Sequence, residues 1–144
     1  MIVFQKRFLT IHWIDECASV CSEWKGFAIG EDFREGLNKG LEVLIEKKGH
    51  GWLGDLQNMQ LICLEDQKWC RTIWFPQAIQ SGLTKLSIVC PQNILAQTSL
   101  FKIMYEMHYP SLEVAYFTNR QKAQVWLKNS TAKRRSSPTV RQSV

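Results

Sequence analysis

The stretch that decides the fold lies between residues 52 and 76 and contains Trp52-Leu-Gly-Asp-Leu, Gln57-Asn-Met, Leu64-Glu-Asp-Gln-Lys-Trp and Trp74-Phe-Pro. Its first part is a short apolar run, typical of a buried strand, and ends on a lone carboxylate, Asp55. A turn follows, in which Asn58 suits a left-handed position. A helix is then predicted from about residue 64 to residue 74. Pro76 predicts a break in helical geometry at Phe75.

Outward from this stretch, the chain alternates between strand and helix patterns. The turn between the second and third strands is expected at Asp15–Glu16, and a capping box of Thr118 and Gln121 is expected to begin the last helix. Apolar periodicity assigns the other elements. The predicted strands cover residues 2–5, 8–14, 17–24, 52–56, 85–90 and 112–117, and the predicted helices cover residues 31–48, 64–74, 75–82, 93–106 and 118–128.

This order of elements predicts an α/β protein. An N-terminal β-hairpin precedes alternating helices and strands, which form a mostly parallel sheet flanked by helices. Gly36 and Gly40 share one face of the helix at 31–48, which favours a close approach of that helix to a strand. Residues 1–128 are expected to form one domain. The Ser/Thr-rich basic tail, residues 129–144, is expected to be disordered because it has almost nothing to bury.

Much of the positive charge lies in that tail. The 144 residues carry a formal net charge of +5, which falls to about +1 without the four cations of the tail, Lys133, Arg134, Arg135 and Arg141. Nucleic-acid-binding domains usually carry their positive charge on a folded face with stacking aromatic rings, so no specific nucleic-acid partner is expected. No apolar run approaches the roughly 20 residues that span a bilayer. A cytoplasmic protein without a membrane span is therefore predicted.

No cofactor, metal site or catalytic residue is indicated. Zinc sites and redox dithiols need clustered ligands, whereas the five cysteines are dispersed and the three histidines stand singly at positions 12, 50 and 108. For Cys63, a role as a reactive thiol is an alternative to a structural role. It precedes the helix predicted from residue 64, whose dipole would lower the pKa of the thiol and raise its reactivity. His12, on a strand, is expected to be a surface or core histidine.

Several blocks of the sequence occur together in one known group of proteins. The blocks are Trp24-Lys-Gly-Phe, Glu31-Asp-Phe-Arg-Glu-Gly-Leu, residues 52–59, residues 65–69, Trp74-Phe-Pro and Leu112-Glu-Val-Ala-Tyr-Phe. Over roughly residues 1–128 the chain resembles small bacterial STAS-like proteins of the SpoIIAA-like superfamily. The resemblance implies a sheet with helices packed against it and a regulatory role through protein contacts, without an established chemistry.

The resemblance also implies a switch that this sequence lacks. The better-studied STAS relatives are controlled by phosphorylation of a serine in an Asp-Ser-Ser-Gly segment that follows an Asp-Leu pair. When Asp55-Leu56 is aligned with that pair, Cys63, Leu64 and Glu65 stand in place of Asp-Ser-Ser. The phosphorylatable hydroxyl is missing. The lipid-carrier branch of the superfamily implies a second role, the binding of an apolar ligand between sheet and helices.

Our leading hypothesis is a non-enzymatic, STAS-like interaction domain that binds another protein or itself. Ligands of open α/β sheets bind beyond the carboxyl ends of the strands, so Asp55 and Asn58 are candidate contacts there. Trp69, Trp74 and Phe75 are candidates for an apolar partner surface or pocket lip. Two structural alternatives remain open: Asp55 could accept hydrogen bonds from the following loop, and the aromatic residues could pack in the core at the break.

Two other functions remain possible. One is a carrier of an apolar small molecule or lipid, with a cavity between the sheet and the helices of residues 64–106. The other is an enzyme that uses Asp55 or Cys63, although no second inward-facing carboxylate is expected near Asp55 and no partnering histidine lies near Cys63 in the sequence.

Overall fold

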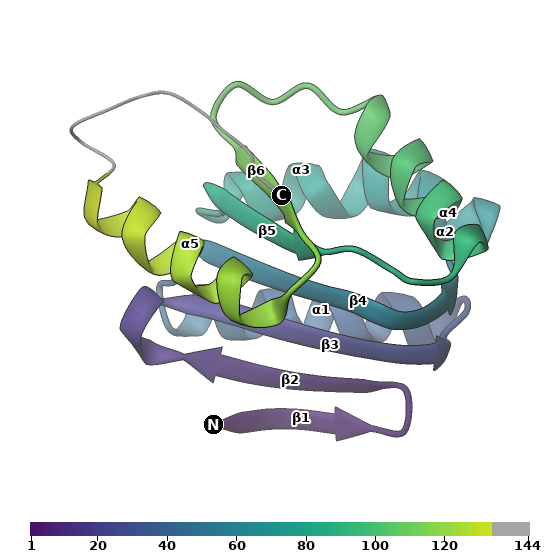
Figure 1. The fold of residues 1–144 in the computed structure, drawn as a ribbon, viewed down its shortest axis with the longest axis horizontal. Helices are drawn as coiled ribbons and strands as arrows, with labels where there is room; N and C mark the ends of the chain where they lie inside the picture. The colour runs from purple at the N-terminus through teal and green to yellow at the C-terminus, as the bar shows by residue number, and fades with distance from the viewer. Residues whose placement is uncertain (134–144) are drawn as a thin grey trace.

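The computed structural model describes residues 1–133, and the strands of this range form one six-stranded mixed sheet in the order β1-β2-β3-β4-β5-β6 (Figure 1). β2 is antiparallel to both neighbours, whereas β3 to β6 run parallel to one another. The predicted α/β class is confirmed, but the parallel arrangement holds only for the last four strands. The strands are β1 (Ile2–Lys6), β2 (Leu9–Ile14), β3 (Ser19–Phe27), β4 (Gly51–Leu61), β5 (Lys85–Val89) and β6 (Glu113–Phe117).

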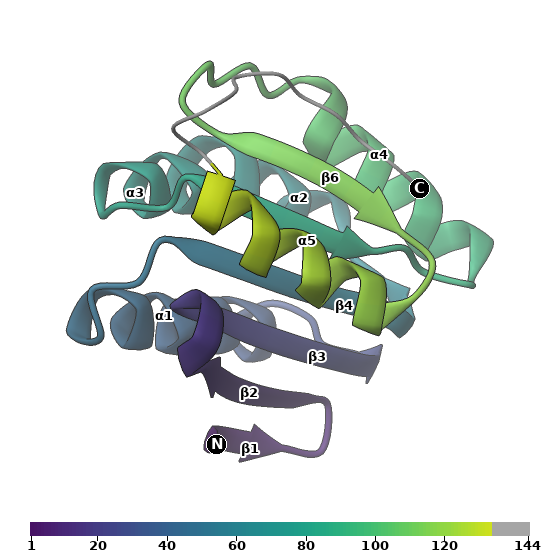
Figure 2. The ribbon, with the colours of Figure 1, turned by 60° about the vertical axis from the view of Figure 1, so that its left-hand side comes forward.

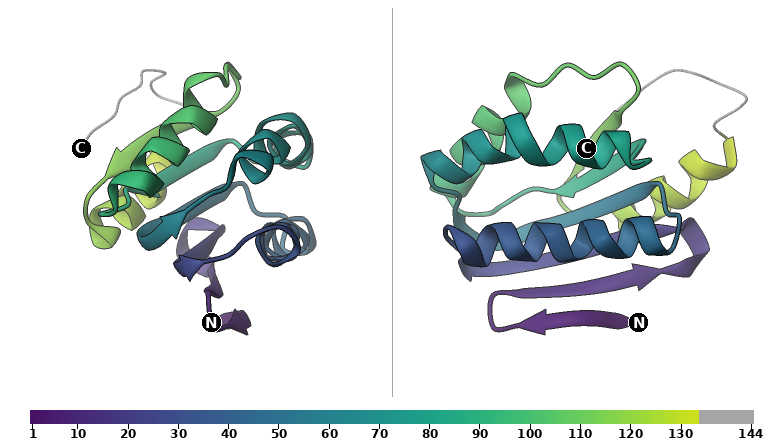
Figure 3. Two further views of the ribbon diagram at one scale, coloured as in Figure 1. Left: turned by 90° about the vertical axis from the view of Figure 1, so that its right-hand side faces the viewer. Right: turned by 180° about the vertical axis from the view of Figure 1, so that it is seen from behind.

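The helices lie on both faces of this sheet (Figures 2 and 3). Each connection between neighbouring parallel strands is a crossover, and right-handed crossovers in one direction place their helices on one face. The last helix follows β6 and turns back onto the other face. The helical segments are η1 (Asp15–Cys17), α1 (Glu31–Glu46), α2 (Leu64–Trp69), the π-helical η2 (Cys70–Trp74), α3 (Phe75–Gln80), α4 (Ile94–Tyr105) and α5 (Arg120–Lys133).

Two separate clusters of buried side chains fill the two layers. Because side chains alternate along a strand, Trp52 and Leu86 join the larger cluster, beneath α1 to α4, while Leu53 and Val89 join the smaller one, beneath α5. The smaller cluster consists of Cys17, Cys21, Leu53, Val89, Ala115, Phe117, Ala123 and Leu127. The cysteines at 17 and 21 therefore pack as core residues on the α5 face.

The glycines of α1 permit the close approach that the sequence predicts. A Cβ on Gly36 would collide with Leu9, and a Cβ on Gly40 would collide with the indole of Trp52. Both glycines are buried against the sheet. The helix accepts their low propensity because a larger residue would push it away from its strands.

The helical connection between β4 and β5 is interrupted but not ended at the predicted break. α2 passes into the π-helical η2, and α3 then begins at Phe75, with Pro76 in its first turn. A π segment widens the helix by one residue, and such segments occur where the i to i−4 ladder is locally disturbed. Pro76 lacks the N–H that an uninterrupted helix would need, so the π segment directly before it is the form that the break takes.

Four predicted boundaries are wrong. β4 continues to Leu61 instead of ending near Asp55, and the connection from β2 to β3 is η1 with a left-handed Ala18, not a two-residue turn. The cap of α5 is Asn119, whose Oδ1 accepts from the N–H of Lys122 at 2.9 Å, not Thr118. α5 extends to Lys133, five residues beyond the predicted boundary. The rest of the predicted tail, residues 134–144, lies outside the described residues.

Candidate functional site

Asp55 lies within β4, not at its end, but it lies opposite the last residue of β5, Val89, and opposite Glu23 of β3. It is therefore close to the carboxyl end of the shorter strand β5. Its carboxylate is 5% exposed, and Oδ1 accepts from the backbone N–H and the side-chain amide of Gln57, at 3.2 and 3.3 Å. Oδ1 therefore has the structural role that the sequence left open: it accepts a hydrogen bond from the backbone that directly follows Asp55.

The other oxygen of Asp55 belongs to a polar cluster that the sequence did not reveal. Arg120, the first residue of α5, places Nη1 3.6 Å from Asp55 Oδ2 and 3.1 Å from Glu23 Oε1. Its Nη2 donates to Cys21 Sγ at 3.3 Å. His12 Nε2 faces Glu23 Oε1 at 3.8 Å. We call these five residues the Arg120 cluster.

The charges of the Arg120 cluster largely compensate one another. Burial tends to lower the pKa of Arg120, but its contacts with Cys21, Glu23 and Asp55 outweigh this and raise the pKa. Burial and the guanidinium lower the pKa of His12, against a smaller opposite effect of Glu23. Burial raises the pKa of Cys21 to about 12, so this thiol stays protonated at neutral pH. The arrangement fastens α5 to β3 and β4.

One signal in the sequence could have predicted this cluster. Residues that follow parallel strands directly come together at one edge of the sheet. Arg120 follows β6 by three residues, and Glu23 lies in β3. Alignment of β3, β4 and β6 by their carboxyl ends would have placed Arg120 near Glu23 and Asp55. The predicted early end of β4 hid this register.

Cys63 is not an activated thiol. Burial is the largest effect on its pKa and raises it, and the Asp66 carboxylate, whose Oδ2 accepts from Sγ at 3.1 Å, raises it further. The backbone N–H groups of Asp66 and Glu65, at the start of the helix, lower the pKa but are outweighed, so the predicted net lowering is wrong. The same carboxylate is fully buried, pairs with Arg34 Nε at 3.0 Å and accepts from the N–H of Gly30 at 2.8 Å. It joins α2 to the start of α1.

Asn58 occupies a strand position and not a left-handed turn. It lies in β4 opposite Lys25 of β3 and is exposed. Ala18 and Lys48 are the two non-glycine residues with positive φ among the described residues, so the turn interpretation of Asn58 is wrong. It lies three positions beyond Asp55 along β4 and forms no hydrogen bond or ion pair with the Arg120 cluster.

The aromatic candidates divide between core and surface. Trp74 and Phe75 are 2% and 6% exposed, and Trp74 Nε1 donates to the carbonyl of Leu37 at 3.2 Å. The core alternative therefore describes these two side chains, and they form no outer partner surface. Trp69 is partly exposed, with the guanidinium of Arg34 5.5 Å from its ring centroid.

A small apolar cavity lies between the sheet and its larger helical layer. Its volume is about 70 Å³, and its smallest lining residues, both on the sheet, are Gly54 and Ser22. A Cβ on Gly54 would meet no atom within 4 Å. Cavities of roughly 150 Å³ hold one benzene molecule, so this space suits a few heavy atoms and not a lipid chain. Its other lining residues include Trp24, Leu37, Trp52, Trp74, Phe75 and Met104.

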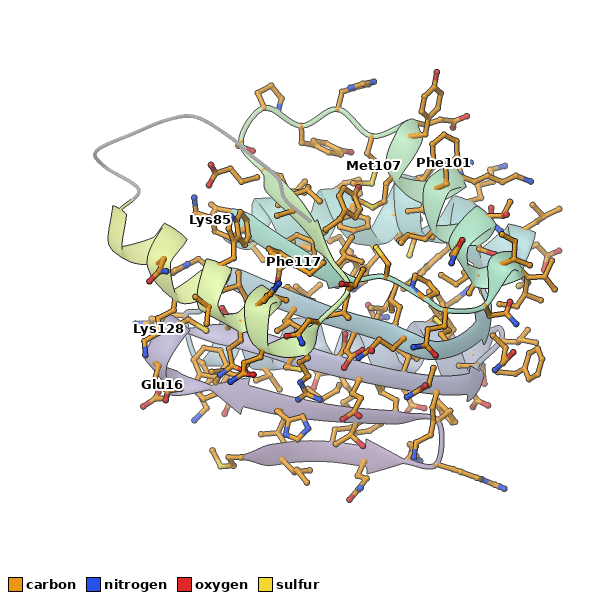
Figure 4. The ribbon with its side chains drawn as sticks, in the orientation of Figure 1. Glu16, Lys85, Phe101, Met107, Phe117 and Lys128 are labelled. Atoms are coloured by element: carbon orange, nitrogen blue, oxygen red, sulfur yellow. The ribbon has the colours of Figure 1, made fainter. Side chains whose placement is uncertain are left out.

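Exposed apolar side chains gather on α4 and β6, in the region where Phe101 and Met107 are labelled in Figure 4. Phe101 and Tyr105 of α4 stack with ring centroids 5.1 Å apart, yet they are 61% and 67% exposed. Two surface hollows of about 450 and 460 Å³ lie between α4 and β6, and both are lined by Met104 and Tyr116. We call the two hollows with Phe101 and Tyr105 the α4–β6 surface.

In comparisons with known proteins, no family model, no curated protein and no solved structure matches the chain. Within residues 1–133, no helix is long and apolar enough to cross a bilayer, and no group of three or more His, Cys, Asp or Glu side chains is arranged to hold a metal ion.

Proposed function

We propose that this chain is a non-enzymatic, STAS-like interaction domain that binds a folded protein through the α4–β6 surface. The observation that carries the proposal is the composition of α4. Its inner face packs into the larger core through Leu100 and Ile103. Its outer face also carries large apolar side chains: Leu95, Phe101 and Tyr105. Large apolar side chains gathered on an exposed surface often mark an interaction site, so this part of the outer face of α4 is suited to a partner.

The polar residues support a non-enzymatic role. In the Arg120 cluster, the guanidinium contacts the carboxylates of Glu23 and Asp55 and the thiol of Cys21. Each of these three groups therefore already has a partner within the chain. An activated nucleophile or general base needs a perturbed pKa and room for a substrate. Here the thiols of Cys21 and Cys63 have raised pKa values. This pattern favours a structural role.

The proposed domain works without the serine switch of the STAS relatives. Leu64, at the position aligned with the phosphorylated serine, begins α2 and is 68% exposed, but it has no hydroxyl group. Control by binding at the α4–β6 surface needs no residue there. The carrier alternative gains no support from the core cavity, because its 70 Å³ is too small for an acyl chain.

Site-specific photo-cross-linking tests the proposal. A photoreactive amino acid replaces Tyr105 in one variant and Ile45 in a control variant. Ile45 is an apolar residue of α1 and is 52% exposed, and the helix α1 lies apart from α4 (Figure 3). We expect a discrete cross-linked protein adduct in cells with the probe at position 105 and none with the probe at 45. Equal labelling at both positions, or none at 105, would contradict the proposal.

A further inference from the structure

The two outer strands of the sheet differ in their protection. Natural proteins block open edges with bulges and lysines, which prevent another strand from pairing there. β1 has both, a register shift between Ile2 and Phe4 and Lys6 at its end. β6 pairs with β5 through five residues in unbroken register and contains neither lysine nor proline. Among the described residues no strand covers its outer edge.

The hollows of the α4–β6 surface lie beside this open edge, on one sheet face. Val114 and Tyr116 lie opposite Leu86 and Ile88, two residues of the larger core, so both side chains point toward the α4 side. They also line the hollows. A strand added to β6 would therefore form backbone hydrogen bonds along the edge and present alternate side chains to the hollows. This combination is typical of binding by strand addition.

We propose that the added strand is β6 of a second copy of this chain. The two β6 strands pair antiparallel around a two-fold axis at Ala115. This inference rests on the proposed function, since it names the partner of the α4–β6 surface. In this register Val114 lies opposite Tyr116 of the second copy, and Ala115 lies opposite its own equivalent. Each Tyr116 ring reaches the partner's hollow beside Val114, which Met107 and Leu112 also line.

The charges of β6 suit self-pairing. Glu113, the acidic residue of the strand, is bound within its own chain by Lys85, its neighbour on β5. Around the two-fold axis Glu113 lies opposite Phe117 of the second copy, so no like charges face each other. The hollow next to α4 is lined by uncharged residues: Cys90, Pro91, Gln97, Leu100, Phe101, Met104, Tyr105 and Tyr116. The two side chains of β6 on this face of the sheet, Val114 and Tyr116, are uncharged and match that lining.

Sedimentation equilibrium of the purified chain over about a hundredfold concentration range tests the proposal. We expect a reversible dimer. Tyr116→Lys, at a half-exposed position, places two like charges into the interface by symmetry and should raise the dissociation constant about a hundredfold. The matched control is Val3→Lys on the protected edge, which should leave the constant unchanged. A Tyr116→Lys dimer of undiminished affinity would overturn the inference, and so would a wild-type chain that stays monomeric throughout.

The register has its own test in a Cys90→Ser background, because Cys90 lies near Tyr116. Mixed Val114→Cys and Tyr116→Cys proteins should form a disulfide dimer at least ten times faster than either protein alone. Opposite residues lie within disulfide reach, whereas each variant alone places its thiols on a diagonal of 7–8 Å, as is typical of paired strands. Equal rates would reject the two-fold axis at Ala115.

These outcomes separate the two proposals. A monomeric wild type whose position 105 still cross-links to a different protein in cells would end the second-copy inference and leave the interaction domain standing. A dimer with no cross-link at 105, but sensitive to Tyr116→Lys, would keep the β6 pairing and remove α4 from the interface.

Discussion

The Arg120 cluster and the α4–β6 surface are opposites in how their residues are satisfied. In the cluster, one guanidinium meets two carboxylates and a thiol, and every charge has a partner inside the chain. On the α4–β6 surface, two stacked aromatic rings and an open strand edge face outward. Ligands of α/β proteins usually bind at the carboxyl end of the sheet. Here the side chains at that end, those of the Arg120 cluster, contact one another and stabilise the fold. The exposed groups that we propose for binding lie at the side of the sheet instead.

Removal of the guanidinium should have the largest effect. Arg120→Ala leaves the buried Asp55 beside a second acid without their cation, so we expect the free energy of unfolding to fall by about 2–3 kcal/mol in urea titrations. The matched control is Arg71→Ala, which breaks the 3.3 Å pair with the exposed Glu106 and should cost no more than about 0.5 kcal/mol. Equal losses in both variants would show that the cluster is an ordinary surface ion pair.

Two glycine substitutions compare a position where an added Cβ would collide with its neighbours and a position where it would have room. Gly36→Ala should destabilise the protein by about 1–2 kcal/mol, because its Cβ collides with Leu9. Gly54→Ala should stabilise it by about 0.5 kcal/mol, since its Cβ enters the core cavity and the substitution restricts the unfolded chain. Thermal and urea unfolding measure both. Destabilisation by Gly54→Ala would mean that the cavity is not available to a methyl group.

Acid should weaken the Arg120 cluster through His12. Its folded pKa is lowered from 6.5 by burial and by Arg120, so the unfolded state binds the proton more readily. The resulting stability is present above about pH 6.5 and is lost as the pH falls through the folded pKa. Between pH 7.5 and 5.5 the wild type should therefore lose more stability than His12→Gln. Parallel pH profiles for the two proteins would remove His12 from this account.

The smallest effect on stability is expected on the α4–β6 surface. Phe101→Ser and Tyr105→Ser should each change the free energy of unfolding by no more than about 0.5 kcal/mol, because both side chains are mostly exposed. Cross-linking from the probe at position 105 should nevertheless be lost when Phe101→Ser is added to the probe variant. A loss of 2 kcal/mol or more from either substitution would show that the rings belong to the core and would break the contrast with Arg120.

The fold was predictable to the extent that local patterns determine it. The helix at 31–48, its glycine face and the alternation of later elements follow from side-chain periodicity, which is a property of neighbouring residues. The end of β4 was not predictable in the same way. Gln57, Asn58 and Gln60 are polar residues typical of loops, but pairing with β3 keeps this segment extended to Leu61.

The candidate site was predictable only in part. Asp55 was identified, but its partners Glu23 and Arg120 are distant in sequence, so only the register of the strands reveals the cluster. The pair of Trp74 and Phe75 was assigned to a possible surface because aromatic residues suit both interfaces and cores. In the structure both side chains are buried, at the junction between the π segment and α3.

The position of α5 in the chain has a consequence for synthesis on the ribosome. Ala123 and Leu127 cover one side of the sheet, yet they are made after all six strands. Until they emerge, the apolar groups of Leu53, Val89 and Phe117 have no helical cover. The nascent polypeptide therefore passes through a stage in which α1 to α4 cover one face of the sheet while the other face is still exposed. A chaperone that binds apolar surface would bind most readily at this stage.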